Sequence, residues 1–327
     1  MGMTAENLPG NGTRESIRTR AWRSVKRVSP FLVSLLIVLY ILSRLDRRQV
    51  IASIQHANLF FFLPLMIFFV FVWFYIESQN IHALIKSYGH DFTYFDSLKM
   101  RGITYLLMII NYGLGVGGMA VYLNRQFSLP FNRARNLMIV YSFVEVAALA
   151  FMSVFGCLFV RDYSKMIENV MVFSVSIFLL YVLLYLVFQH MPEKGALAKI
   201  KNLNIVKCFC EIRHWEMLLL VFWRGIYFAS FILFFYAAFQ TFGIKIPLPI
   251  IAAYTPIIFF IGAIPFTPFG LGSIQAAMLY FYQDYGLPPQ IFAISLAYST
   301  LIILLRMPIG LYYSRSYKLG EGPGRDR

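Results

Sequence analysis

Long stretches of apolar residues alternate with short polar breaks along most of this chain. The apolar runs approach or reach the roughly 20 residues that a helix needs to cross about 30 Å of hydrocarbon. The predicted spans lie near 30–45, 59–79, 136–160, 169–190, 215–240 and 289–312. The pattern therefore predicts an all-α fold, a polytopic membrane helix bundle with about six to eight spans.

Two further apolar segments, 102–122 and 249–285, are interrupted by glycine and proline. The interrupting residues are Gly113, Gly115, Gly117 and Gly118 in the first segment, and Pro256, Pro265, Pro268, Gly270 and Gly272 in the second. Broken backbone at membrane depth is tolerated only where protein or a watery cavity satisfies the freed amide and carbonyl groups. We therefore predict that both segments are re-entrant.

The two broken segments also share a short motif. Residues 112–118 read YGLGVGG, and residues 269–275 read FGLGSIQ. If the two segments enter from opposite sides, they form an inverted repeat, in which interrupted helices meet near the midplane and line a substrate site. A match this short also arises by chance in a chain rich in glycine and leucine, so duplication and coincidence both remain open.

Composition and charge support the membrane interpretation. The chain is 59% hydrophobic and 13% charged, and its bases, which give a net charge of +14, gather in tails and loops. Bases between apolar runs follow the positive-inside rule and form no surface for reading nucleic acid, so no nucleic-acid partner is predicted. We predict a basic cytoplasmic tail at 1–29, a transmembrane domain at 30–315 with a basic linker at 191–214, and a cytoplasmic tail at 316–327.

This topology leaves one group of bases on the outer side, at Arg44, Arg47 and Arg48. An amphipathic stretch lying on the membrane surface around 46–57 would accommodate them. With both termini cytoplasmic, we predict an integral protein of the bacterial cytoplasmic membrane.

Two charged residues lie at similar depth inside predicted spans, Glu145 in the span that starts near Asn136 and Arg224 in the span that starts near Trp215. A charge inside the membrane is costly, so it tends to face protein or water and to find a partner. The functional interpretation is a Glu145–Arg224 pair that borders a polar cavity, with Arg224 available to a lipid phosphate. The alternatives are a structural pair, or an Arg224 side chain that snorkels to the inner surface.

Further charges lie near the predicted inner interface. Glu77 and Arg306 are within snorkelling range of it, and Arg101, Arg125 and Arg306 would ring a cytoplasmic mouth that attracts anionic headgroups. The alternative is ordinary positive-inside flanking of the spans.

The chain carries few residues suited to catalysis. Its five histidines lie in loops or near span ends, and neither an H-E-x-x-H nor a G-x-S-x-G motif occurs. Cys208 and Cys210 lie near Glu211 and His214, but one C-x-C pair without a second is most simply part of an ordinary linker. We predict no metal site and no cofactor. The polar groups Asn111 and Gln275, on the broken segments, are candidates for ligand binding.

These residues together resemble the transmembrane region of the lysylphosphatidylglycerol synthase family, a flippase-like membrane domain. The late family signature, approximately Pro-Gly-Gly-hydrophobic-Gly-x-x-Glu, is matched by the stretch 268–275, and a Gly-x-Pro-Pro turn follows at 286–289. The early signature is echoed by Asn111 to Gly118 and then Arg125, and Glu145 occupies the acidic position of the next helix. The resemblance covers about residues 30–315.

The resemblance implies a substrate site built from both broken segments and the charged pair. Its residues are Asn111, Gly115, Gly118, Arg125, Glu145, Arg224, Pro268, Gly270, Gly272 and Gln275. Phe269 replaces a family glycine and Gln275 replaces the expected acid, so a function that needs a carboxylate at position 275 does not carry over.

Three classes of function remain open. The first is a translocator or binding protein for a lipid or lipid-linked amphiphile, either an anionic phospholipid or a polyprenyl-linked lipid. The second is a scaffold of a complex that modifies envelope lipids or glycans. The third is an intramembrane transferase that acts on lipid headgroups, although the chain has no room for the soluble synthase domain that the resemblance would require for aminoacyl transfer.

Overall fold

The computed structural model describes residues 31–161, 164–191, 203–264, 267 and 270–315, and within these ranges it is helical with no strand. After a first helix, Phe31–Arg44, the helices are α2 (Arg47–His56), α3 (Leu59–Ser87), α4 (Tyr94–Ile110), α5 (Tyr112–Phe127), α6 (Phe131–Leu158), α7 (Lys165–His190), α9 (Asn204–Glu211), α10 (His214–Thr241), α11 (Leu248–Ala263), α12 (Ser273–Tyr282) and α13 (Pro288–Arg315). The predicted tails, most of the linker and Pro268 lie outside the described residues.

Five of the described helices, α3, α6, α7, α10 and α13, are long and apolar enough to cross a membrane. Each exceeds the length that about 30 Å of hydrocarbon requires, since a helix rises about 1.5 Å per residue. They correspond to five of the six predicted spans, and the sixth is the shorter apolar helix Phe31–Arg44. The prediction of an all-α polytopic membrane bundle is confirmed.

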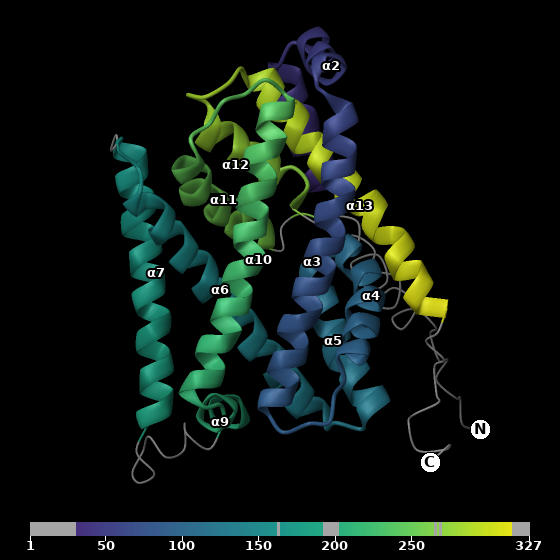
Figure 1. Cartoon of the computed structure of the whole chain (residues 1–327), viewed down its shortest axis with the longest axis vertical. Coiled ribbons are helices and arrows are strands. Elements are labelled where there is room, and N and C mark those ends of the chain that lie inside the picture. The colour runs from purple at the N-terminus through teal and green to yellow at the C-terminus, as the bar shows by residue number, and fades with distance from the viewer. Residues whose placement is uncertain (1–30, 162–163, 192–202, 265–266, 268–269, 316–327) are drawn as a thin grey trace, which may run out of the picture.

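The order of elements repeats along the chain with its direction reversed (Figure 1). A long helix, a pair of short helices and another long helix appear first as α3, α4–α5 and α6, and again as α10, α11–α12 and α13. The α4–α5 pair lies toward the lower end of the bundle in Figure 1, and the α11–α12 pair lies toward the upper end. The two short pairs therefore enter the bundle from opposite ends, as the shared motif predicts for an inverted arrangement.

The first pair is a helical hairpin that turns at Asn111. This residue is extended (φ −164°, ψ 140°), and its side chain accepts a hydrogen bond from Gly113 N as it caps α5. The predicted break is thus misplaced, because Gly113, Gly115, Gly117 and Gly118 all lie within α5. Gly115 and Gly118 instead let α5 approach α4 closely, since an added Cβ would fall 2.0 Å from Met108 Cγ or 2.3 Å from Leu107 Cδ1.

The second pair, α11–α12, is also a hairpin, and the hydroxyls of Thr255 and Tyr282 meet 3.0 Å apart across it. Its turn contains Gly270 and Gly272, whose φ angles of 71° and 91° are in the region that favours glycine. Ser34 on the first helix donates to the carbonyl of Leu271, 2.8 Å away, so that helix packs against the turn.

The surface stretch predicted around residues 46–57 forms α2, which begins after the capping side chain of Asp46. Most of its residues are exposed or half-buried, and Val50 is its buried residue. A short helix with one apolar anchor fits a position at the membrane surface.

Close packing of α6 against α11 depends on small residues. Ser153 donates to the carbonyl of Ala253, 2.8 Å away, and an added Cβ at Gly156 would lie 2.3 Å from the Ala252 carbonyl carbon. Backbone atoms cannot rotate away as a flexible side chain could. The two helices would therefore have to separate if Gly156 gained a side chain.

We expect Gly156→Val to destabilise the protein by about 1–3 kcal/mol or more, the usual cost of overpacking. The temperature at which half of the detergent-purified protein remains monodisperse should fall clearly. Gly117→Val is the matched control on another helix, since an added Cβ there meets nothing within 4 Å. Equal loss in both variants would contradict the packing argument.

Candidate functional site

The tips of both hairpins open onto one cavity of about 110 Å³ in the bundle. Asn111 and Tyr112 come from the first tip, and Thr267 and Gly270 come from the second. Residues of α3, α4, α6, α10, α11, α12 and α13 complete the lining. Segments more than a hundred residues apart in sequence therefore meet at this point.

A buried ion pair connects α3 and α4 at the cavity wall. Arg101 donates from Nε to Oε2 of Glu77 at 2.8 Å and from Nη2 to Oε1, so the two side chains pair through both arms. Tyr105 donates to the same carboxylate at 3.1 Å. Both side chains are 2% exposed, so the pair is shielded from solvent and its hydrogen bonds hold the two helices together.

A second pair joins α6 to α10. Arg224 Nη2 lies 2.7 Å from Oε1 of Glu145, and its Nη1 donates to the hydroxyl of Tyr141 at 3.0 Å. The same Nη1 is 3.8 Å from Oε1 of Glu77, so the two pairs form one cluster. The structure thus contains the Glu145–Arg224 pair that depth alone predicted, and Tyr112 from the first hairpin tip donates to Glu145 as well.

Arg306 on α13 is the third arginine of the cluster. It lines the cavity, is 6% exposed, and places its guanidinium 4.6 Å from the ring centre of Tyr105. The predictions that Glu77 and Arg306 snorkel and that Arg101 and Arg306 ring a cytoplasmic mouth are wrong. Packing encloses all three side chains, because each charge finds an opposite charge or an aromatic face inside the bundle.

The cluster is rich in arginine. Three arginines, Arg101, Arg224 and Arg306, lie among two glutamates, Glu77 and Glu145. In addition, Arg101 Nη1 is buried and has no hydrogen-bond acceptor among the described residues. A buried donor without an acceptor is costly, so this part of the cavity favours an anion.

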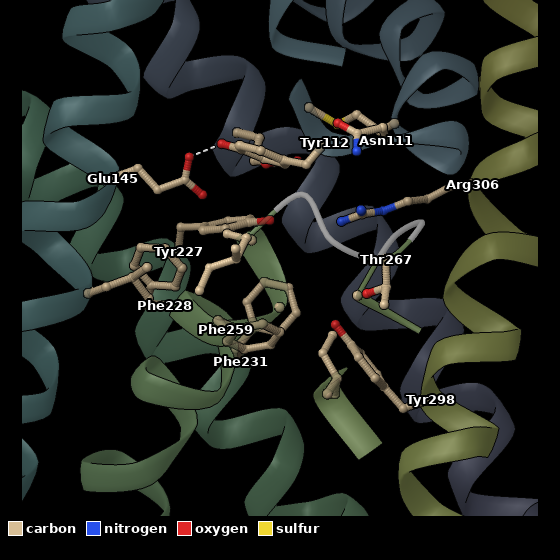
Figure 2. A pocket seen from close by; sticks show the side chains of 18 of the residues that line it. Asn111, Tyr112, Glu145, Tyr227, Phe228, Phe231, Phe259, Thr267, Tyr298 and Arg306 are labelled. Atoms are coloured by element: carbon tan, nitrogen blue, oxygen red, sulfur yellow. Dashed lines mark hydrogen bonds between the residues drawn. The ribbon is translucent and has the colours of Figure 1, made fainter. Parts of the chain in front are cut away.

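The remainder of the lining is aromatic. Figure 2 shows Glu145 and Arg306 on opposite sides of the cavity, with Asn111 and Tyr112 between them, and Phe231, Phe259 and Tyr298 gathered below. The cavity therefore has a polar part next to the first hairpin and an apolar part next to α10 and α11. This division suits a molecule with one polar and one apolar end.

The hairpin tips also contribute helix ends. Both α5 and α12 begin beside the cavity, since Asn111, the N-cap of α5, and Ile274, in the first turn of α12, line it. A helix N-terminus carries a partial positive charge. These two helix ends add to the attraction for a negative group.

The structure separates the other predicted site residues from the cavity. Gln275 is fully buried and links Gly272 N, at 2.6 Å, to the hydroxyl of Ser299, at 2.9 Å, so it fastens the second hairpin to α13. Gly115 and Gly118 face α4, and Gly272 faces Ile37 of the first helix. Arg125 is exposed in the last turn of α5, at the open end of the first hairpin.

Sequence reasoning missed Tyr227 and Thr267, and it placed Glu77, Arg101 and Arg306 at the inner interface although all three line the cavity. Glu77 and Arg306 did carry a signal, since each is a charge within a long apolar helix. Their places near the ends of the predicted spans 59–79 and 289–312 favoured snorkelling instead, and only packing shows which neighbours they have.

The described residues around Cys208 and Cys210 form no group of metal ligands. Within the described ranges no three His, Cys, Asp or Glu side chains are grouped as metal ligands. Burial, followed by the nearby carboxylate of Glu211, raises the pKa of the Cys208 thiol, which disfavours the thiolate that metals bind.

The family profile described as "Lysylphosphatidylglycerol synthase TM region" matches residues 28–310 of the chain. The chain belongs to this family. The match includes both hairpins and every residue of the charged cluster, and so confirms the predicted family over nearly its whole predicted extent. The lysylphosphatidylglycerol synthase transmembrane-region family and the five apolar helices together establish an integral membrane protein related to lipid handling. Comparison with curated proteins finds no match to this chain.

Proposed function

We propose that this protein binds an anionic lipid or lipid-linked amphiphile in the cavity between the two hairpins and moves it between leaflets. The observation that carries the proposal is the buried cluster of Arg101, Arg224 and Arg306 with Glu77 and Glu145 at the hairpin tips, in which Arg101 Nη1 has no hydrogen-bond acceptor among the described residues. A headgroup that crosses the hydrocarbon needs a polar environment midway, and this cluster supplies one.

The division of the cavity supports an amphiphile over a soluble anion. Phe231, Phe259 and Tyr298 offer an apolar surface directly beside the charged groups. The hairpins would then be re-entrant in the membrane, since α4 and α5, with 17 and 16 residues, are too short to cross about 30 Å comfortably.

The end of the bundle that carries α9 is proposed to face the cytoplasm of a bacterial cell. This end includes the open end of the first hairpin and the adjacent helix ends. Its described bases are Lys86, Lys99, Arg125, Arg133, Arg135, Lys207, Arg213 and Arg315. Six described bases lie at the other end, namely Arg44, Arg47, Arg48, Arg161, Lys165 and Lys245. The α9 end therefore holds a small excess of described bases, which is in the direction of the positive-inside rule.

Exchange of lipids between leaflets tests the proposal. Purified protein is reconstituted into vesicles with lipids labelled on an acyl chain, and an added impermeant reductant bleaches the label in the outer leaflet. Loss of signal beyond half indicates exchange, and we expect it for anionic lipid with the protein but not in empty vesicles. Mass spectrometry of the recovered lipid should show no covalent change, whereas a modified headgroup would favour a transferase. Absence of exchange for every lipid tried would contradict the proposal.

A further inference from the structure

A groove lies directly beside the cavity, between α6, α7 and α11. Its lining includes Leu149 and Ala150 from α6, Phe173 and Ile177 from α7, and Ile257 and Phe260 from α11. Leu149 lines the cavity as well, so the two spaces share it as a wall. Resting on the proposed function, we infer that an acyl chain of the bound amphiphile passes over Leu149 into this groove and reaches the surrounding hydrocarbon between α7 and α11.

The cavity by itself holds only the headgroup of a lipid. Its volume is about 110 Å³, and one water molecule needs roughly 10–15 Å³ of such space. A molecule with long hydrocarbon chains therefore extends beyond the cavity. The apolar part of the lining gives the direction in which the chains leave, because Phe259 of the cavity precedes Phe260 of the groove on α11.

The lining of the groove suits hydrocarbon. Ser174 is its polar member, and the Ser174 hydroxyl donates to Oγ of Ser153 at 2.9 Å, which in turn donates to the carbonyl of Ala253 at 2.8 Å. The Ser174 hydroxyl is therefore already bonded within the protein. A methylene chain placed beside it leaves no polar group without a partner.

The groove also lies at the depth of the charged cluster. Val146, one of its lining residues, follows Glu145 directly in α6, and Leu149 lies about one helical turn further on. A headgroup beside Glu145 is thus within one turn of the groove. Its chain leaves sideways into the membrane and does not have to run along the bundle axis.

Two phenylalanine rings close the groove on its lipid side. Phe173 of α7 and Phe260 of α11 meet edge to face, with ring centres 6.0 Å apart. The groove has a volume of about 10 Å³ with the rings in this position. Phe173 is 44% exposed, so its ring can turn outward, as exposed side chains do within nanoseconds. The rings therefore act as a door that is closed in this structure.

Both helices beside this door can move. Of the most apolar 18-residue window of α7, 11% is buried, so few contacts hold α7 in place. The other helix, α11, contains Pro256, which has no N–H to donate to the carbonyl of Ala252, so α11 bends more easily here than an uninterrupted helix would. The opening between α7 and α11 can therefore widen to admit a chain.

The test closes this opening covalently. Phe173→Cys and Phe260→Cys are combined in one protein and joined by a short reducible cross-linker. The control joins Phe151→Cys to Phe178→Cys, at positions whose rings lie 5.7 Å apart and connect α6 to α7 outside the groove lining. Exchange of acyl-labelled phosphatidylglycerol is measured in vesicles before cross-linking, after it, and after reduction. The native cysteines replaced by alanine in both proteins are Cys157, Cys208 and Cys210.

We expect the cross-link between positions 173 and 260 to lower exchange by about tenfold or more, and reduction to restore it. The control cross-link should leave the rate within about twofold, since it holds α7 without closing the opening. Phe173→Ala removes one ring of the door and should raise the rate. Equal inhibition by both cross-links, or a rate that full cross-linking of 173 to 260 leaves unchanged, would overturn the inference.

Photolabelling keeps this result distinct from failure of the proposed function. Detergent-purified wild type is irradiated with phosphatidylglycerol that carries a diazirine in the middle of one acyl chain, with and without excess unlabelled lipid, and labelled residues are mapped by mass spectrometry. If excess lipid removes the label from Ile177 or Phe260 while no lipid is exchanged in vesicles, the groove stands and translocation does not. If exchange occurs but the competed label lies only on other surfaces, translocation stands and the groove does not.

Discussion

Replacing Glu77 with glutamine is expected to destabilise the protein more than any other single change in the cavity. The carboxylate accepts two hydrogen bonds from Arg101 and one from Tyr105, and it lies 3.8 Å from Arg224. Without it, Arg101 loses the carboxylate that it pairs with, and Arg224 keeps only Glu145. Breaking a buried pair by removing one partner costs about 3–5 kcal/mol, because the remaining charge stays desolvated.

The measurement is the temperature at which half of the detergent-purified protein remains monodisperse, which suits a protein whose unfolding is irreversible. The matched control replaces both partners, Glu77→Met with Arg101→Met, and so removes one negative and one positive charge together. An apolar pair of similar volume is often as stable as a buried ion pair, so the double variant should recover most of the loss. A single variant as stable as the wild type would contradict the role of the pair.

Arg224→Leu is expected to reduce lipid exchange by about 10–100-fold, the effect of losing about 1.4–2.7 kcal/mol of stabilisation of the translocating state. The substitution removes one positive charge and leaves Glu145 without the guanidinium that lies 2.7 Å from it. An anionic headgroup would then meet a less positive cluster and a carboxylate that has lost its arginine.

The exchange rate is measured per monodisperse protein, so that any loss of folded material does not count as loss of transport. Arg224→Lys keeps the charge but not the planar fork that bonds Glu145 and Tyr141, and we expect an intermediate rate. Arg135→Leu removes an exposed arginine of α6 and should exchange lipid as the wild type does. Exchange by Arg224→Leu at the wild-type rate would exclude a role for this side chain.

Much of the fold could be predicted because membrane spans depend on local composition. Five apolar runs became the five long helices, and the two broken segments became the two hairpins. The positions of the turns were less predictable. The glycines of YGLGVGG are helical, and the chain turns one residue earlier at Asn111, because a glycine can equally well allow two helices to pack closely.

The candidate site was predicted in part. The pairing of Glu145 with Arg224 was predicted from their similar depth, because depth can be estimated by counting residues from the start of each span. Arg125 was predicted by motif, yet it lies exposed at the open end of its hairpin, away from the cavity lining. Gln275 was predicted as a ligand group, and the structure places it in hydrogen bonds that fasten α12 to α13.

The sequence by itself determined that the chain is a helical membrane protein, which segments are interrupted, and which family it resembles, because hydropathy and motifs are local properties. Only the tertiary structure decided that Glu77, Arg101 and Arg306 join the predicted pair around one cavity. These residues come from three different helices. Hydropathy alone does not tell whether a charged side chain near the end of a span reaches the membrane surface or is buried in the bundle. Packing of the two hairpins between the long helices removes that ambiguity, since it encloses these side chains where only opposite charge and aromatic faces can stabilise them.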